Sequence, residues 1–163
     1  MEKNNSGLGL AVLGGLVLIG IAKGGTNPDP DPDPSTPSLA LAIQTLTRFT
    51  SLVYNYPHIN ATLTNNTTKP IVGRSVNLYV RYISPADGLP RLRTGSLGSA
   101  LMVDGVPQSQ AYPSISLNHG ESLSVDFIGN PNVAMPRDVD CEVWLEDATT
   151  KATSNIMVSP ATI

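Results

Sequence analysis

The chain has 163 residues, a net charge of −3 and a single cysteine, Cys141. This length suits one domain with a substantial core, and a lone cysteine excludes an intrachain disulfide. The near-neutral charge excludes the basic surface that nucleic-acid binding requires. We therefore expect one folded domain that does not bind nucleic acid.

An uncharged apolar stretch, Gly7–Ala22, lies near the N-terminus. As an α-helix these 16 residues would span about 24 Å, short of a hydrocarbon core of roughly 30 Å, but uncharged flanking residues extend it. We predict a hydrophobic transmembrane helix within residues 1–25. Two alternatives stay open: a helix buried in a protein assembly, and a cleaved signal peptide, for which Gly20 and Ala22 supply small residues.

The apolar stretch offers two kinds of contact. Small residues recur every four positions at Gly7, Ala11 and Gly15, which gives a helix one smooth face for close packing. Larger apolar side chains expected to contact lipid or neighbouring helices are Leu16, Leu18 and Ile19. Flanking basic residues set almost no orientation. The polar, β-patterned remainder favours an N-terminus inside and the β domain outside a membrane.

Residues 26–38, TNPDPDPDPSTPS, form a Pro/Asp-rich segment. Proline fixes φ and forces each preceding residue into extended geometry, so we expect a stiff linker of about 40 Å. Carboxylates two residues apart do not share a face of a polyproline helix, so the aspartates do not predict a calcium site.

Residues 39–163 show a period of two, which is typical of half-buried antiparallel strands. The alternating apolar positions, which we expect to point inward, are Leu39, Leu41, Ile43; Ile59, Ala61, Leu63; Val76, Leu78, Val80, Tyr82; Ile115, Leu117; Leu123, Val125, Phe127; Val139, Cys141, Val143, Leu145; and Ile156, Val158. Asp104-Gly105 predicts a tight hairpin turn. About seven or eight strands of this kind indicate an all-β sandwich.

Three pieces of this region resemble an immunoglobulin-like module of the kind found in cell-surface and phage or archaeal-virus proteins. They are residues 59–68 followed by 76–80, residues 120–127, and residues 139–147 leading into the last strand. The resemblance implies a single antiparallel immunoglobulin-like sandwich. The inter-sheet disulfide of antibody domains is missing, and the resemblance implies no ligand.

No catalytic or metal-binding pattern stands out. His58 and His119 are far apart and fit no zinc spacing, and there is no Gly-x-Ser-x-Gly motif. Alternation places Asp140, Glu142 and nearby acidic residues on a solvated face and Cys141 in the core. We predict no catalytic residue, no metal ligand and no cofactor.

Strand alternation places Tyr79, Arg81 and Trp144 outward. In an immunoglobulin-like sandwich their two strands are neighbours, so the three side chains would share one exposed face. Trp, Tyr and Arg most often anchor protein interfaces. We predict a partner-binding face here; the alternatives are that the linker or a loop such as residues 85–99 covers Trp144, or that the register is shifted by one residue.

These features favour a non-enzymatic structural protein of a virion or cell envelope. Its expected partners are a lipid bilayer or neighbouring helices, and other coat or envelope proteins or copies of itself. A surface adhesin or carbohydrate-binding module is the main alternative, and an envelope enzyme with an unrecognised site is the third.

Overall fold

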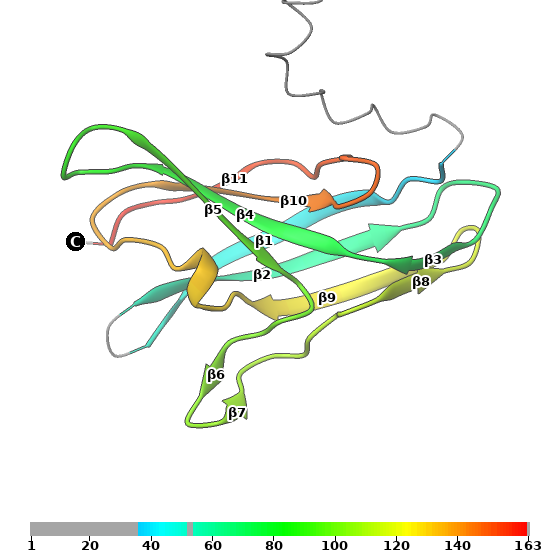
Figure 1. Ribbon diagram of the computed structural model, residues 1–163, viewed down its shortest axis with the longest axis horizontal. Coiled ribbons are helices and arrows are strands. Elements are labelled where there is room, and N and C mark those ends of the chain that lie inside the picture. Colours follow the sequence, from blue (N-terminus) through cyan, green and yellow to red (C-terminus); the bar gives the residue numbers. More distant parts are fainter. Residues whose placement is uncertain (1–35, 52–53, 163) are drawn as a thin grey trace, which may run out of the picture. The chain divides into compact units, whose positions relative to one another are not determined.

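The structure, a computed structural model, describes residues 36–51 and 54–162 (Figure 1). This part of the chain is all-β, and its one helical element is the 3₁₀ turn η1 (Pro131–Val133). The strands are β1 (Ala40–Thr50), β2 (Asn55–Thr64), β3 (Ile71–Arg74), β4 (Val76–Ile83), β5 (Pro90–Ser96), β6 (Met102–Val103), β7 (Val106–Pro107), β8 (Ile115–Leu117), β9 (Ser122–Ile128), β10 (Cys141–Asp147) and β11 (Met157–Ser159).

Two antiparallel sheets form the main layers. One sheet has three strands in the order β1-β2-β9, and the other has four in the order β11-β10-β4-β5. Figure 1 shows these strands in two layers, with the short pairs β3-β8 and β6-β7 beside them. The predicted antiparallel β architecture is confirmed over the described residues.

The main apolar core lies between the two sheets, and a smaller cluster forms around Tyr56, Leu101, Ile128 and Ala134. Inward residues such as Ile59 and Phe127 from the first sheet and Leu78 and Val143 from the second are almost fully buried in one cluster. On β4 and β10 buried residues alternate with more exposed ones, as the period of two predicts. Cys141 is buried as expected, and this burial raises the pKa of its thiol.

The structure corrects three sequence-based expectations. Residues 85–99 contain β5 rather than forming only a loop, and β5 pairs with β4 at the edge of the sheet instead of covering Trp144. Strand β3 was not predicted. On β11, Met157 pairs with Val143, and Ile156 and Val158 are exposed rather than inward.

Asp104 and Gly105 join β6 to β7 with φ values of 50° and 77°. Positive φ at both central residues is what a type I′ turn requires, and this explains the Asp-Gly pair. The predicted hairpin is confirmed.

A buried ion pair fixes the start of the described chain. The Arg74 guanidinium lies 3.0 Å from the Asp147 carboxylate, and both side chains are buried. Arg74 also donates to the carbonyl of Pro37 at 2.7 Å, so the end of the Pro/Asp-rich segment is held against β3 and β10. The backbone N–H groups of Thr149 and Thr150 donate to Asp147 as well. Both oxygens of the buried carboxylate therefore accept hydrogen bonds.

Candidate functional site

The candidate site is the solvent-facing side of the four-stranded sheet, which we call the outer face. It consists of the outward residues of four strands, and its central members are Tyr79 and Arg81 of β4 with Glu142 and Trp144 of β10. The register places Trp144 directly opposite Tyr79 and Glu142 directly opposite Arg81. The three residues singled out from the sequence thus lie together.

Tyr79 and Trp144 form a stacked pair at the centre of the outer face. Their ring centroids are 5.3 Å apart and their planes differ by only 6°. Directly opposed cross-strand residues are close enough for such a stack, which adds to the stability of the sheet. Trp144 is half-buried rather than fully exposed, because Tyr79 covers one side of its ring.

Arg81 contacts both neighbours on β10. Its Nε donates to Glu142 Oε2 at 2.6 Å, and its guanidinium carbon lies 5.6 Å from the centroid of the Trp144 ring. The first contact is a charge-assisted hydrogen bond and the second is a cation–π contact. Together they hold Arg81 over the sheet instead of leaving it free in water.

A second set of polar contacts lies on the other side of the aromatic pair. The Tyr79 hydroxyl donates to Glu146 Oε1 at 3.2 Å, and Lys151 Nζ lies 3.7 Å from the same oxygen. Partial burial raises the pKa of Tyr79, and the adjacent Glu146 carboxylate raises it further. Tyr79 is therefore a neutral hydrogen-bond donor at physiological pH.

Exposed aliphatic side chains surround this centre. They are more than half accessible to solvent, and they are Ile83, Leu92, Ile156 and Val158. Leu92 lies opposite Arg81 on β5, and Val158 lies opposite Glu142 on β11. The outer face is therefore an aromatic and charged centre with apolar residues at both edges.

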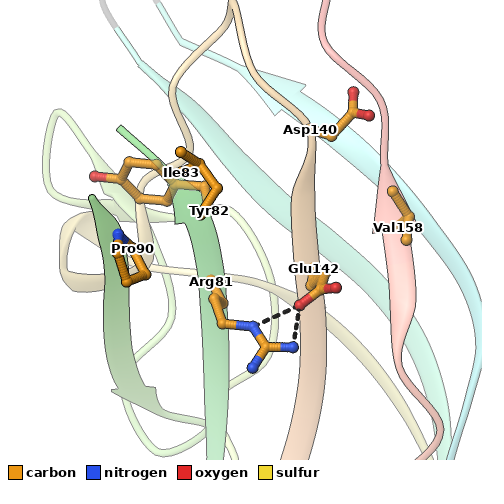
Figure 2. Close-up of a pocket in the computed structure, with 7 residues that line it drawn as sticks. All are labelled: Arg81, Tyr82, Ile83, Pro90, Asp140, Glu142 and Val158. Carbon is orange, nitrogen blue, oxygen red and sulfur yellow. Dashed lines mark hydrogen bonds and ion pairs between the residues drawn. The ribbon is translucent and has the colours of Figure 1, made fainter. Parts of the chain in front are cut away.

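A hollow of about 560 Å³ opens on this face beside the Arg81–Glu142 pair (Figure 2). Figure 2 shows the two side chains pointing toward each other from adjacent strands, with Val158 on the strand beyond Glu142. Ile83 and Pro90 line the opposite side of the hollow. Its wall therefore combines apolar groups with the Arg81–Glu142 ion pair and the carboxylate of Asp140.

The outward side of the three-stranded sheet is different, and we call it the polar face. Its side chains are bonded to one another in cross-strand pairs: Gln44 with Thr62, Asn60 with Thr45, Thr64 with Ser122, and His58 with Asp126. None of the exposed large hydrophobic residues of the described chain is on these stretches of β1, β2 and β9. This face has the composition of an ordinary solvated sheet surface.

The two histidines of the chain lie in separate contacts on the described part of the domain. His58 Nε2 lies 2.6 Å from Asp126 beside a hollow of about 250 Å³ that Gln108, Ser109 and Tyr112 also line. His119 instead contacts the carbonyl of Thr67. Within the described ranges, no group of three or more His, Cys, Asp or Glu side chains is arranged to hold a metal ion.

The predicted helix-packing residues Gly7, Ala11, Gly15, Leu16, Leu18 and Ile19 lie outside the described residues. In the part of the chain that the structure does describe, no helix has the length and apolar character to span a membrane. The anchor and its orientation stay predictions.

The sequence did not identify the aliphatic members of the outer face. Ile156 and Val158 were assigned to the core, and Leu92 and Ile83 were not singled out. In Ile156-Met157-Val158 all three consecutive residues are apolar, so alternation alone does not show whether Met157 or its two neighbours point inward. Register in the sheet settles it, because Met157 pairs with the buried Val143.

No family model and no curated protein matches this chain. Among solved structures, a β-glucosidase involved in saponin metabolism from intestinal bacteria aligns with a TM-score of 0.47 at 14% identity, over 77% of this chain and 16% of that one. A β-glucosidase from Listeria innocua aligns with a TM-score of 0.47 at 13% identity, over 78% and 16%. A β-glucuronidase from Bacteroides uniformis aligns with a TM-score of 0.37 at 14% identity, over 76% and 13%. The chain spans about a sixth of the length of the two β-glucosidases, and similarity at this level carries no conclusion about activity.

Proposed function

We propose that this protein is a non-enzymatic structural protein of a virion or cell envelope, whose β domain binds neighbouring envelope proteins through the outer face. One observation carries the proposal: the stacked Tyr79–Trp144 pair and Arg81 lie at the centre of a face with exposed aliphatic residues at both edges. Aromatic and arginine anchors inside an apolar surround are typical of protein interfaces.

The order of the strands supports an immunoglobulin-like assignment for the domain. In that fold the second strand pairs with the fifth, and the third pairs with the sixth. Here β2 pairs with β9, β4 pairs with β10, and β10 pairs with β11. One feature departs from the constant-type arrangement, because β5 extends the four-stranded sheet beside β4. Domains of this kind commonly present a sheet face to a partner.

The N-terminal segment supplies the proposed attachment. Residues 1–25 would anchor the protein in a bilayer or in a bundle of helices, and residues 26–38 would hold the β domain away from it. The contact between Arg74 and the Pro37 carbonyl supports this arrangement, because it fixes the point at which the linker meets the domain.

A carbohydrate-binding module or adhesin is the runner-up. The hollow beside Arg81 and Glu142 favours it, because charged side chains can bind sugar hydroxyl groups. A sugar-binding platform, however, needs a free aromatic ring face. Tyr79 covers one face of Trp144, and Arg81 contacts the same ring. This arrangement supports a protein partner over a sugar.

The test compares Trp144→Ala with Thr62→Ala, a matched change on the polar face. Each tagged full-length variant would be expressed in the native source and captured from envelope material in mild detergent. We expect Trp144→Ala to weaken binding to envelope proteins about 30-fold, equal to about 2 kcal/mol for a hot-spot residue, and Thr62→Ala to leave it unchanged. Equal capture by both variants would contradict the proposal, and loss of glycan binding without loss of protein capture would favour the runner-up.

The attachment has its own test. The full chain should stay in the membrane pellet after carbonate extraction, and a chain starting at Gly24 should be soluble, because it lacks the apolar stretch. Extraction of the full chain as readily as the shortened chain would contradict a membrane span and favour a helix buried in a protein assembly.

A further inference from the structure

We infer that the partner of the outer face is a second copy of this chain, packed face to face about a two-fold axis parallel to β4 and β10. The inference rests on the proposed function, because it names the occupant of the same face. It is carried by the order of side chains across the sheet, which is complementary to itself under that rotation.

The rows of residues across the four strands show this self-complementarity. In one row the order from edge to edge is apolar, basic, acidic, apolar: Leu92, Arg81, Glu142, Val158. The next row on the same face has the two aromatic rings at its centre, with Thr94 beside Tyr79. A further row is polar throughout: Ser96, Asn77, Glu146, Thr153. The first and third of these rows keep their character when read from the opposite edge, except that the two central charges of the first change places. In the aromatic row the rings exchange, but the edges differ: Thr94 lies on one side and the exposed Ile156, just before β11, on the other.

A two-fold axis along the strands reverses each row and keeps its level. It therefore places Leu92 over Val158 of the second copy and Tyr79 over its Trp144. Arg81 comes to lie over Glu142 of the second copy, and the same contact is made twice, as an isologous interface requires. At the centre of the face aromatic rings therefore meet aromatic rings and opposite charges meet, and at its edges Leu92 meets Val158.

The other in-plane two-fold axis, perpendicular to the strands, does not have this property. Through the Tyr79–Trp144 row it would place Glu142 over Glu146 of the second copy. Like charges facing each other across an interface are destabilising. The charge pattern therefore selects the axis parallel to the strands.

The ionic contacts within the face also favour a neutral partner. Arg81 is paired with Glu142, and Lys151 with Glu146, so the face has no large excess of either charge to attract a strongly charged molecule. A second copy brings the same balanced surface. Each Arg81 would share two carboxylates, which forms a closed ring of four alternating charges.

The size of the face sets the expected strength. Three strands of 7 or 8 residues and the edge strand β11 of 3 residues cover at most roughly 19 Å by 24 Å. Summed over both copies this is about 900 Å² at most, the size of a weak or transient interface, so we expect dimers at micromolar concentration or above rather than a permanent assembly. Anchoring in a common membrane or particle would raise the local concentration and favour the dimer.

The first test exchanges the charges between copies. The full chain in mild detergent carries either Arg81→Glu or Glu142→Arg, and dimer dissociation is measured by sedimentation. Each variant alone should dissociate at least about tenfold more readily, because carboxylates or guanidiniums then face each other. An equal mixture should form a mixed dimer of near-original affinity. Mixing does not repair the repulsion inside either chain, so recovery reports contacts between chains.

Any association through residues 1–25 is common to all of these variants and cancels in the comparison. A mixture that dissociates like the single variants would overturn the inference. Circular dichroism of each variant checks that the β domain is folded.

The second test traps the geometry directly, with Leu92→Cys in one tagged chain and Val158→Cys in another. Within one chain these positions lie on opposite edges of the sheet, about 14 Å apart, too far for a disulfide. Mild oxidation should link the two variants to each other, and chains that all carry Leu92→Cys should not link. Linkage of Leu92→Cys to itself, or no linkage in the mixture, would overturn the inference.

These outcomes are separable from those of the proposed function. If neither exchange nor trapping occurs and Trp144→Ala still loses its envelope partners, the second copy is wrong and the proposed function stands. If Trp144→Ala captures all partners normally, the proposed function fails with it.

Discussion

The outward surfaces of the two sheets differ in the kind of side chain that covers them. On the polar face, threonine, serine and asparagine pairs bond across β1, β2 and β9 and leave no large apolar group exposed. On the outer face of the four-stranded sheet, an aromatic pair lies between exposed aliphatic residues at both edges. The polar face also carries the exposed His58–Asp126 contact, and the outer face carries the Arg81–Glu142 and Lys151–Glu146 ion pairs.

This difference indicates which exposed apolar residues are not needed for the fold. The polar face proves that a sheet of this domain is compatible with an outward surface of hydroxyl and amide groups. Ile83, Leu92, Ile156 and Val158 are therefore not required to form strands. Exposed apolar residues occur on the outer face and on several loops and short strands but not on the polar face, and this difference is what the proposed interaction site would explain.

The largest expected effect comes from placing a charged side chain at an inward position of β10. Val143 is fully buried between Glu142 and Trp144, which point outward. Val143→Asp should abolish folding, because a lone buried carboxylate costs several kcal/mol, comparable to the stability of a small domain. Circular dichroism and thermal melting measure this. A cooperative melt would show that Val143 is not in the core, whereas Glu142→Asp should melt normally.

The second-largest effect is expected at the buried Arg74–Asp147 ion pair. Asp147→Asn should lower the free energy of unfolding by about 3 kcal/mol, because it leaves the buried Arg74 guanidinium without its counter-charge. Urea denaturation measures the change. Asp126→Asn, an exposed carboxylate on the polar face, is the control and should have a much smaller effect. Equal effects would mean that the Arg74–Asp147 pair is not buried.

The stability of the domain at acid pH should depend on the same Asp147 carboxylate. Burial by itself would raise the pKa of Asp147, but hydrogen bonds from Thr149 and Thr150 and from Arg74 outweigh it and hold the pKa below its usual range. The unfolded chain therefore takes up the proton first, at a pKa of about 3.9, and stability falls as pH decreases below that value through the folded pKa. Denaturation curves between about pH 5 and pH 2 should show this loss. Asp147→Asn should show less of it, and an unchanged slope in that variant would assign the acid sensitivity to other groups.

Long alternating runs made part of this arrangement predictable. Val76–Tyr82 and Val139–Leu145 have unbroken inward apolar positions, so the outward direction of Tyr79, Arg81 and Trp144 follows from parity alone. Strand β5 was missed because Arg91 and Arg93 occupy positions on its inward side, where an apolar residue would be expected. Arg93 lies there because its guanidinium packs over the Tyr82 ring and donates to the Tyr82 hydroxyl.

Register could not be read from the sequence. The pairing of Arg81 with Glu142 joins residues 61 positions apart and depends on how β4 aligns with β10. The same alignment brings Val158 to the edge of the face. A one-residue slip would have exchanged inward and outward residues on β11, which is the error that Ile156-Met157-Val158 invited.

A smaller effect on stability is expected at Trp144, and its size distinguishes a role in folding from a role in binding. Trp144→Ala should lower the free energy of unfolding by only about 1 kcal/mol, since it removes a half-buried ring and one aromatic stack. Thr62→Ala on the polar face should change it by less than about 0.5 kcal/mol. Urea denaturation of both variants measures this. A loss of several kcal/mol for Trp144→Ala would place the residue in the core and weaken its assignment to an interface.

The smallest effects should come from exposed carboxylates, one chosen on each face. Glu142→Gln and Asp126→Asn are nearly isosteric, and each removes one carboxylate charge from a cross-strand contact. Exposed pairs contribute at most about 1 kcal/mol, because water screens the charges and the side chains lose freedom when they pair. We therefore expect both variants to unfold within about 1 kcal/mol of the original chain. Only Glu142→Gln should weaken self-association in sedimentation, since only its carboxylate faces the second copy. If Asp126→Asn weakened association equally, the polar face would also be a binding surface, and the contrast between the two faces would lose its functional meaning.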